Sequence, residues 1–145
     1  MKKTFLTILL MALALTACHK QTFDERMEAE VIQFNEKQAP KRMDPYTTFD
    51  SMAYDRQALE LNYYYTIDYD FNAQLFTDEE AWNELWQKKR EEVQTQLRDE
   101  LLRNLQSSIQ LKTYKEHGLT FHYTYYLKRT GETVVNCVFT PEDYR

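Results

Sequence analysis

Two stretches of alternating side chains constrain most strongly how this chain can fold. From Leu59 to Asp68 an apolar or tyrosine side chain occupies every second position, and the pattern recurs from Leu119 to Lys128. Such alternation is typical of β-strands that bury one face. A second strand-like segment lies across a short turn from each of them, Tyr46–Tyr54 before the first and Thr133–Thr140 after the second. The sequence therefore predicts two β-hairpins.

A long helical segment separates the two hairpins. Thr77 and Glu80 form a capping-box pattern that begins a helix, and apolar side chains recur at helical spacing from Trp82 to Leu105. A helix that continued to the next glycine would be far longer than the average of about 12 residues, so we expect a break near Ser107. A second capping-box pattern at Ser107 predicts a short helix, which Gly118 ends in the left-handed conformation.

The segment before the hairpins has helical periodicity as well. Apolar side chains spaced three and four residues apart predict a helix over Thr22–Lys37, and the prolines of the linker Gln38–Pro45 stop it. The expected class is α+β: an N-terminal helix, then two hairpins that form a four-stranded, mainly antiparallel sheet, separated by a long helix packed on one face.

The first eighteen residues have the features of an export signal. Lys2 and Lys3 precede an apolar run, Phe5–Leu15, that is shorter than the roughly 20 residues of a membrane-spanning helix. The following Leu15-Thr16-Ala17-Cys18 resembles the lipobox of bacterial lipoproteins, which implies cleavage before Cys18 and lipid attachment to it. An ordinary signal peptide cut after Ala14 is the alternative. The expected division is 1–17 signal peptide, 18–45 lipidated N-terminus with short helix and linker, and 46–145 α+β domain.

The charge and the cysteine content limit the classes of partner that this protein can be expected to bind. The chain has 23 acidic and 18 basic residues, and removal of Lys2 and Lys3 with the signal makes its net charge of −5 more negative. This balance argues against nucleic acid and against an anionic lipid surface as partners. The membrane contact is therefore expected through the lipid on Cys18. Cys137 is left without a disulfide partner and is expected to be a small buried hydrophobe.

Few residues suggest catalysis. The three histidines do not stand at metal-ligand spacing with a supporting Cys, Asp or Glu, so we predict no metal and no cofactor. Asp68 and Asp70 lie two apart in a strand-like run and could act as a carboxylate pair; with His122 they form the weak case for a hydrolase. Nucleophile, base and orienting group cannot be assembled from them, which favours a protein without enzymatic activity.

The tyrosines suggest a contact surface instead. Tyr64, His122 and Tyr126 fall on the strand faces opposite the expected core residues. That second face is too apolar to be left wholly to water. Three explanations remain open: the N-terminal helix covers it, a partner protein or a second copy covers it, or it binds a glycan. These three residues are the candidate partner surface.

The order of the elements and the tyrosine-rich run from His117 to Tyr125 together resemble small uncharacterised envelope lipoproteins of Gram-negative bacteria, especially Bacteroidota. The resemblance implies an α+β fold and brings no catalytic residues. His19, rather than an aspartate, follows Cys18, which by similarity to the usual sorting rule implies the outer membrane, facing the periplasm. The expected function is a protein-binding or self-assembling envelope lipoprotein. An inhibitor or immunity-type lipoprotein is the alternative, with the hydrolase as a weaker one.

Overall fold

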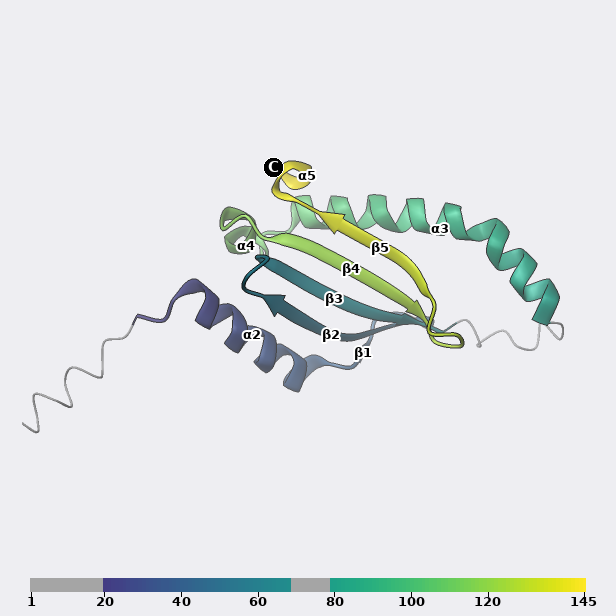
Figure 1. The fold of residues 1–145 in the computed structure, drawn as a ribbon, viewed down its shortest axis with the longest axis horizontal. Coiled ribbons are helices and arrows are strands. Elements are labelled where there is room, and N and C mark those ends of the chain that lie inside the picture. The colour runs from purple at the N-terminus through teal and green to yellow at the C-terminus, as the bar shows by residue number, and fades with distance from the viewer. Residues whose placement is uncertain (1–19, 69–78) are drawn as a thin grey trace, which may run out of the picture.

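A five-stranded mixed sheet forms the centre of the computed structural model, which describes residues 20–68 and 79–145. The strands lie side by side in chain order (Figure 1). β2 pairs antiparallel with β1 and β3, and β5 pairs antiparallel with β4, whereas β3 and β4 are parallel. The bounds are β1 Lys41–Arg42, β2 Thr47–Asp55, β3 Glu60–Ile67, β4 Thr120–Leu127 and β5 Thr133–Phe139. The α+β class and both hairpins are confirmed.

The sheet corrects the prediction in two details. The expected linker contains β1, which pairs with β2 and adds a fifth strand. The inner strands of the two hairpins are parallel because a long helical crossover, not a turn, joins them. The crossover contains α3, Glu79–Ser107, and α4, Lys112–Glu116. It returns the chain to the end of the sheet at which β3 begins, so that β4 runs in the same direction.

The register between β3 and β4 aligns their similar side-chain patterns. Tyr63 lies opposite Tyr123 and Tyr65 opposite Tyr125. The rings of each pair are stacked, with centroids 4.9 Å and 4.5 Å apart respectively and planes 8° apart in both. Such pairs contribute about 0.5–1.5 kcal/mol each beyond the area that they bury. The alternating tyrosines therefore form the central ladder of the sheet.

The helices of the described residues all pack on the face of the sheet that carries this ladder. α2, Phe23–Gln38, lies beside β2, and α3 lies along the β5 side (Figure 1). Met27 and Val31 of α2, Trp86 and Leu105 of α3, and Tyr144 of α5, Pro141–Tyr144, join one core cluster with the buried strand residues. Tyr114 of α4 packs against the same cluster. The core is thus one layer between the helices and this inner face of the sheet.

Polar contacts fix α2 against the sheet. Thr22 and Glu25 form a capping box that begins the helix, one residue from the predicted start. The Asn35 amide donates to the Met52 carbonyl (2.8 Å) and accepts from the Met52 N–H (2.9 Å), as a neighbouring strand would. The Tyr54 hydroxyl donates to Asp24 (2.6 Å). β1 pairs with β2 only at Thr48 and Phe49. Asn35 therefore satisfies the backbone groups of Met52, which lie on β2 beyond the reach of β1.

The ends of the crossover helices confirm one prediction and correct another. α3 ends at Ser107, where the break was expected. Ser107 does not cap the next helix, because its hydroxyl donates to the Arg103 carbonyl of the preceding turn and α4 begins only at Lys112. Gly118 has a φ of +73° and ends this segment as predicted. The capping residue expected at Thr77 lies outside the described residues.

Candidate protein-binding surfaces

Tyr64, His122 and Tyr126 do come together on the face of the sheet opposite the helices. In the parallel register Tyr64 lies opposite Thr124, between the positions of His122 and Tyr126 on β4. All three side chains are partly exposed. In the described part of the chain no helix packs on this outer face, since α2 lies on the inner face with the other helices. The explanation that the N-terminal helix covers the outer face is therefore wrong.

The outer face is ordered by its own side chains. The His122 Nε2–H donates to the Asn136 side-chain oxygen on β5. The Thr66 hydroxyl donates to Asp50 on β2 (2.6 Å). Val138 lies opposite His122 and is 40% exposed. Tyrosine rings, an apolar edge and fixed polar groups are the combination that protein interfaces favour.

A groove on the inner face is a second candidate surface. It has a volume of about 440 Å³ and lies between α3 and the segment that leads into β2. We call it the inner groove; it is lined by Asp44, Pro45, Tyr46, Thr47, Ile67, Val93, Gln96, Leu97, Glu100 and Tyr125. Its volume is in the usual range of ligand sites, about 300–1,000 Å³.

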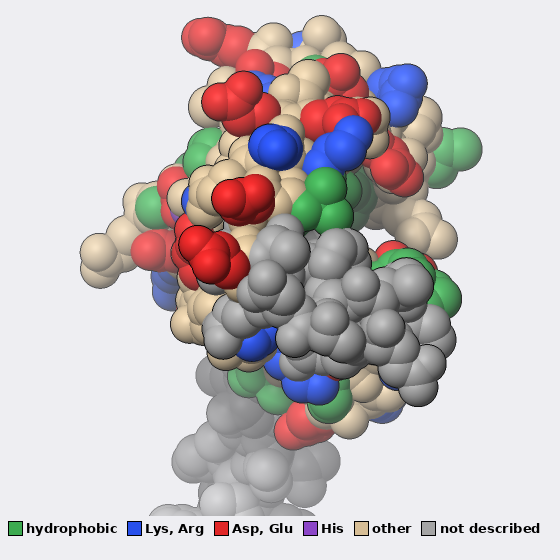
Figure 2. All heavy atoms as spheres, turned by 90° about the vertical axis from the view of Figure 1, so that its right-hand side faces the viewer, with side chains coloured by type: hydrophobic (Ala, Val, Ile, Leu, Met, Phe, Trp, Pro, Cys, Tyr) green, Lys and Arg blue, Asp and Glu red, His purple; other side chains and the backbone are tan. Residues whose placement is uncertain are grey.

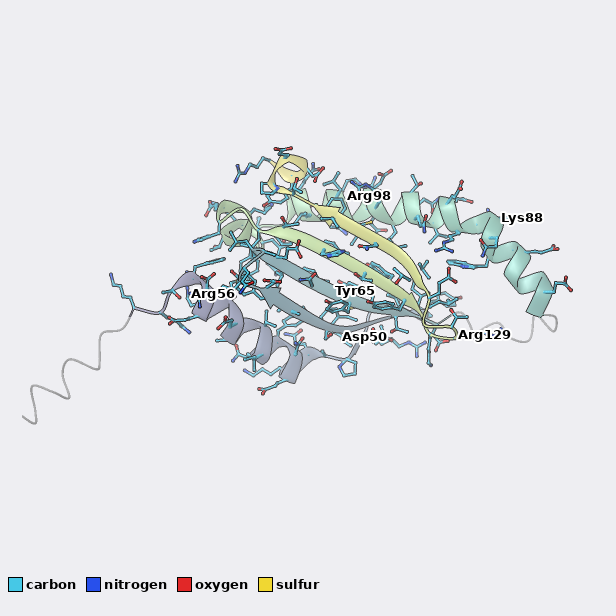
Figure 3. All side chains as sticks on the ribbon, in the orientation of Figure 1. Asp50, Arg56, Tyr65, Lys88, Arg98 and Arg129 are labelled. Carbon is cyan, nitrogen blue, oxygen red and sulfur yellow. The ribbon has the colours of Figure 1, made fainter. Side chains whose placement is uncertain are left out.

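Buried tyrosines line the inner face near this groove. Tyr65 lies between α2 and α3 in the middle of the sheet (Figure 3). Burial raises the pKa of Tyr65 to about 12 and raises the pKa of Tyr125 further. Burial, followed by the charge of neighbouring tyrosines, also raises the pKa of Tyr63 well above its ordinary value. These hydroxyls are neutral at physiological pH, so the three side chains serve as packing groups and not as bases.

A smaller cavity of about 420 Å³ lies between α3 and β5 and reaches Cys137. Arg98 of α3, labelled in Figure 3, contributes to its lining and lies with its guanidinium 4.9 Å from the centre of the Phe139 ring. Burial raises the pKa of the Cys137 thiol, although Arg98 acts in the opposite direction. Cys137 is 3% exposed, so the structure places it in the core as expected, with a protonated thiol.

The residues considered for hydrolysis are not brought together. Asp68 forms an ion pair with Lys128 (2.6 Å), and Asp70 lies outside the described residues. Asp68 follows the end of β3, while His122 pairs with Asn62, six residues earlier on that strand. At about 3.3 Å per residue, Asp68 and His122 are about 20 Å apart. Within residues 20–68 and 79–145, no three His, Cys, Asp or Glu side chains are grouped to hold a metal ion.

Acidic and basic side chains are mixed at the end of the molecule where α3 begins. Figure 2 shows acidic and basic side chains intermingled around the first turns of α3. Arg90 of α3 forms an ion pair with Glu132 in the turn between β4 and β5 (2.6 Å), and Lys89 forms one with Glu92 (2.7 Å). Cys18, the expected lipid attachment site, lies outside the described residues. None of the helices described is long and apolar enough to span a bilayer.

Sequence reasoning missed the inner groove. Val93 and Leu97 belong to the apolar stripe predicted between Trp82 and Leu105, yet both are only partly buried. The groove forms because α3 faces the segment 44–47 across the end of the sheet, a proximity that no local pattern encodes. Helical spacing gives no warning of this, since Val93 and Leu97 share it with Trp86 and Leu105, which are buried.

The described residues thus define an α+β protein whose helices lie on one face of a five-stranded mixed sheet. Residues 22–135 match the family described as a domain of unknown function (DUF8479), and the chain belongs to that family. No curated protein matches the chain by sequence.

Two solved structures are similar in fold. A protein of Pseudomonas aeruginosa described as secreted has a TM-score of 0.58 and 14% identity, over 89% of this chain and 99% of that one. The pilotin EpsS of the Vibrio vulnificus type 2 secretion system has a TM-score of 0.52 and 6% identity, over 81% and 87% of the two chains. At these identities the similarity concerns the fold.

Proposed function

We propose that this protein is a lipoprotein of the cell envelope that binds another protein, or a second copy of itself, through the outer face of its sheet. The observation that carries the binding role is that the described helices all pack on the inner face, so that Tyr64, His122 and Tyr126 remain accessible. A face with rigid tyrosine rings and fixed polar groups favours a protein partner.

Three observations support the envelope location. The lipobox-like Leu15-Thr16-Ala17-Cys18 supports lipid attachment at Cys18. Of the two similar structures, one is described as a secreted protein and the other as a pilotin of a type 2 secretion system. The third is that α2 starts at Phe23, a few residues after the proposed anchor. A domain attached in this way is held near the membrane surface. We place it in the outer membrane, facing the periplasm, among lipoproteins similar to those of Bacteroidota.

The anchor can be tested by changing Cys18 to serine. The thioether bond to lipid needs the cysteine sulfur, so Cys18→Ser should abolish acyl labelling and move the protein from the membrane fraction to the soluble fraction. Cys137→Ser is the matched control and should leave the labelling unchanged. Undiminished acyl labelling of Cys18→Ser would contradict the lipoprotein assignment. Recovery of the wild-type protein in inner-membrane fractions would contradict outer-membrane sorting.

The binding role can be tested by crosslinking in the native envelope. The lipidated wild-type protein should form a reproducible crosslinked species. The double variant Tyr64→Ala/Tyr126→Ala should lose most of it, because aromatic anchors supply a large share of interface energy. Ile32→Ala removes an exposed side chain of α2 and is the control that should retain the species. An unchanged crosslinking pattern in the double variant would rule out the outer face as the contact.

A further inference from the structure

The inner groove combines an apolar lining with two carboxylates. Ile67 and Tyr125 from neighbouring strands, and Val93 and Leu97 from α3, supply side chains that can contact an aliphatic group. Asp44 and Glu100 lie among the lining residues and are both exposed. They come from separate segments, the entry to β2 and the middle of α3. The groove is thus apolar with acidic groups from both of the elements that form it.

The two carboxylates are held differently. Asp44 accepts hydrogen bonds from the backbone N–H groups of Tyr46 (2.7 Å) and Thr47 (2.8 Å), which fixes its orientation. Slight burial raises the pKa of Asp44, but the hydrogen bonds from Tyr46 and Thr47 and the nearby charge of Arg42 together lower it by more, so it is ionised at neutral pH. Glu100 forms no ion pair within the described residues, and its charge contributes to the raised pKa of Tyr125. Glu100 is therefore available to a cation from outside.

From this arrangement we infer that the inner groove binds a protein segment in which one or two aliphatic side chains stand next to a lysine or arginine. The aliphatic side chains would contact Val93, Leu97 and Ile67, while the cation would lie against Glu100 and Asp44. The same carboxylates would repel a fatty acid, an anionic lipid headgroup or an acidic peptide. The inference rests on the proposed protein-binding role and assigns it a second contact, on the opposite face from Tyr64.

A displayed library of random peptides provides a direct test. Peptides are selected from the library for binding to the full chain with the substitution Cys18→Ser, which removes the site of lipid attachment. Enriched peptides should pair aliphatic residues with Lys or Arg. Their affinity should fall at least about tenfold when Glu100 is changed to lysine, because attraction becomes repulsion at the groove. Selection on Glu100→Lys itself should enrich acidic residues in place of basic ones. Glu100 is exposed, so this variant should fold as the wild type does.

Leu97→Gln and Tyr64→Ala complete the design. Leu97→Gln should also weaken the selected peptides, whereas Tyr64→Ala, on the outer face, should leave their affinity unchanged. The inference is overturned if no peptide is enriched, if enriched peptides lack basic residues, or if Glu100→Lys leaves their affinity unchanged. Peptides that respond to Tyr64→Ala alone would also overturn it while supporting the proposed function. Loss of the envelope crosslink in Tyr64→Ala/Tyr126→Ala tests the proposed function separately.

Discussion

Replacing Trp86 with alanine should lower the free energy of unfolding by about 3–5 kcal/mol. Trp86 is 5% exposed and belongs to the core cluster between α3 and the sheet. Its removal leaves a large cavity against rigid neighbours, which can refill the space only in part. For a domain of this size the melting temperature should fall by on the order of 15 °C. Thermal melting followed by circular dichroism is the measurement.

The outer-face variants supply the comparison. Tyr64→Ala and Tyr126→Ala remove partly exposed rings that no described helix covers, so each should lower the unfolding free energy by about 1 kcal/mol. A loss as large as that of Trp86→Ala would mean that these rings belong to a packed core. The contact surface would then have to lie elsewhere.

The protein should lose stability steeply at alkaline pH. Burial raises the pKa of Tyr54, Tyr65 and Tyr114 to about 12, with hydrogen bonds to Asp24 and Glu30 adding to the effect for Tyr54 and Tyr114. The unfolded chain ionises its tyrosines near pH 10. The stabilisation is therefore fully present below pH 10 and is lost as the pH rises towards 12. For Tyr65, which is largely buried, the loss corresponds to about 3 kcal/mol.

Urea unfolding across this pH range, together with the ultraviolet absorbance of tyrosinate, measures the effect. Ionisation of the buried tyrosines should coincide with unfolding, because their hydroxyls give up their protons only when the sheet opens. Tyr65→Phe removes one ionising group while keeping the stacked ring, so its stability should decline less with pH than that of the wild type. If the absorbance difference between wild type and Tyr65→Phe instead appeared near pH 10 with the fold intact, the inner tyrosine would be accessible to solvent.

The candidate surfaces were predictable to different degrees. Strict alternation in β3 and β4 was enough to place Tyr64, His122 and Tyr126 on one face, because the direction of a side chain in a strand depends only on its position. Whether that face is covered could not be read from the chain. The amphipathic N-terminal helix could have packed on either side. The contacts of its Asn35 with Met52 and of its Asp24 with Tyr54, together with Met27 and Val31 in the core, place it on the inner face.

Local patterns by themselves determined the hairpins, the long helix with its end at Ser107, and the turn at Gly118, because each depends on residues close in the chain. Tertiary structure decided the parallel pairing of β3 with β4, the edge strand β1, the single helical layer and the inner groove. These depend on which segments meet after the crossover closes. The arrangement that forms is the one that buries the core and stacks the tyrosines of β3 on those of β4. The stacked tyrosines are about sixty positions apart in the chain, so no local pattern could predict their pairing.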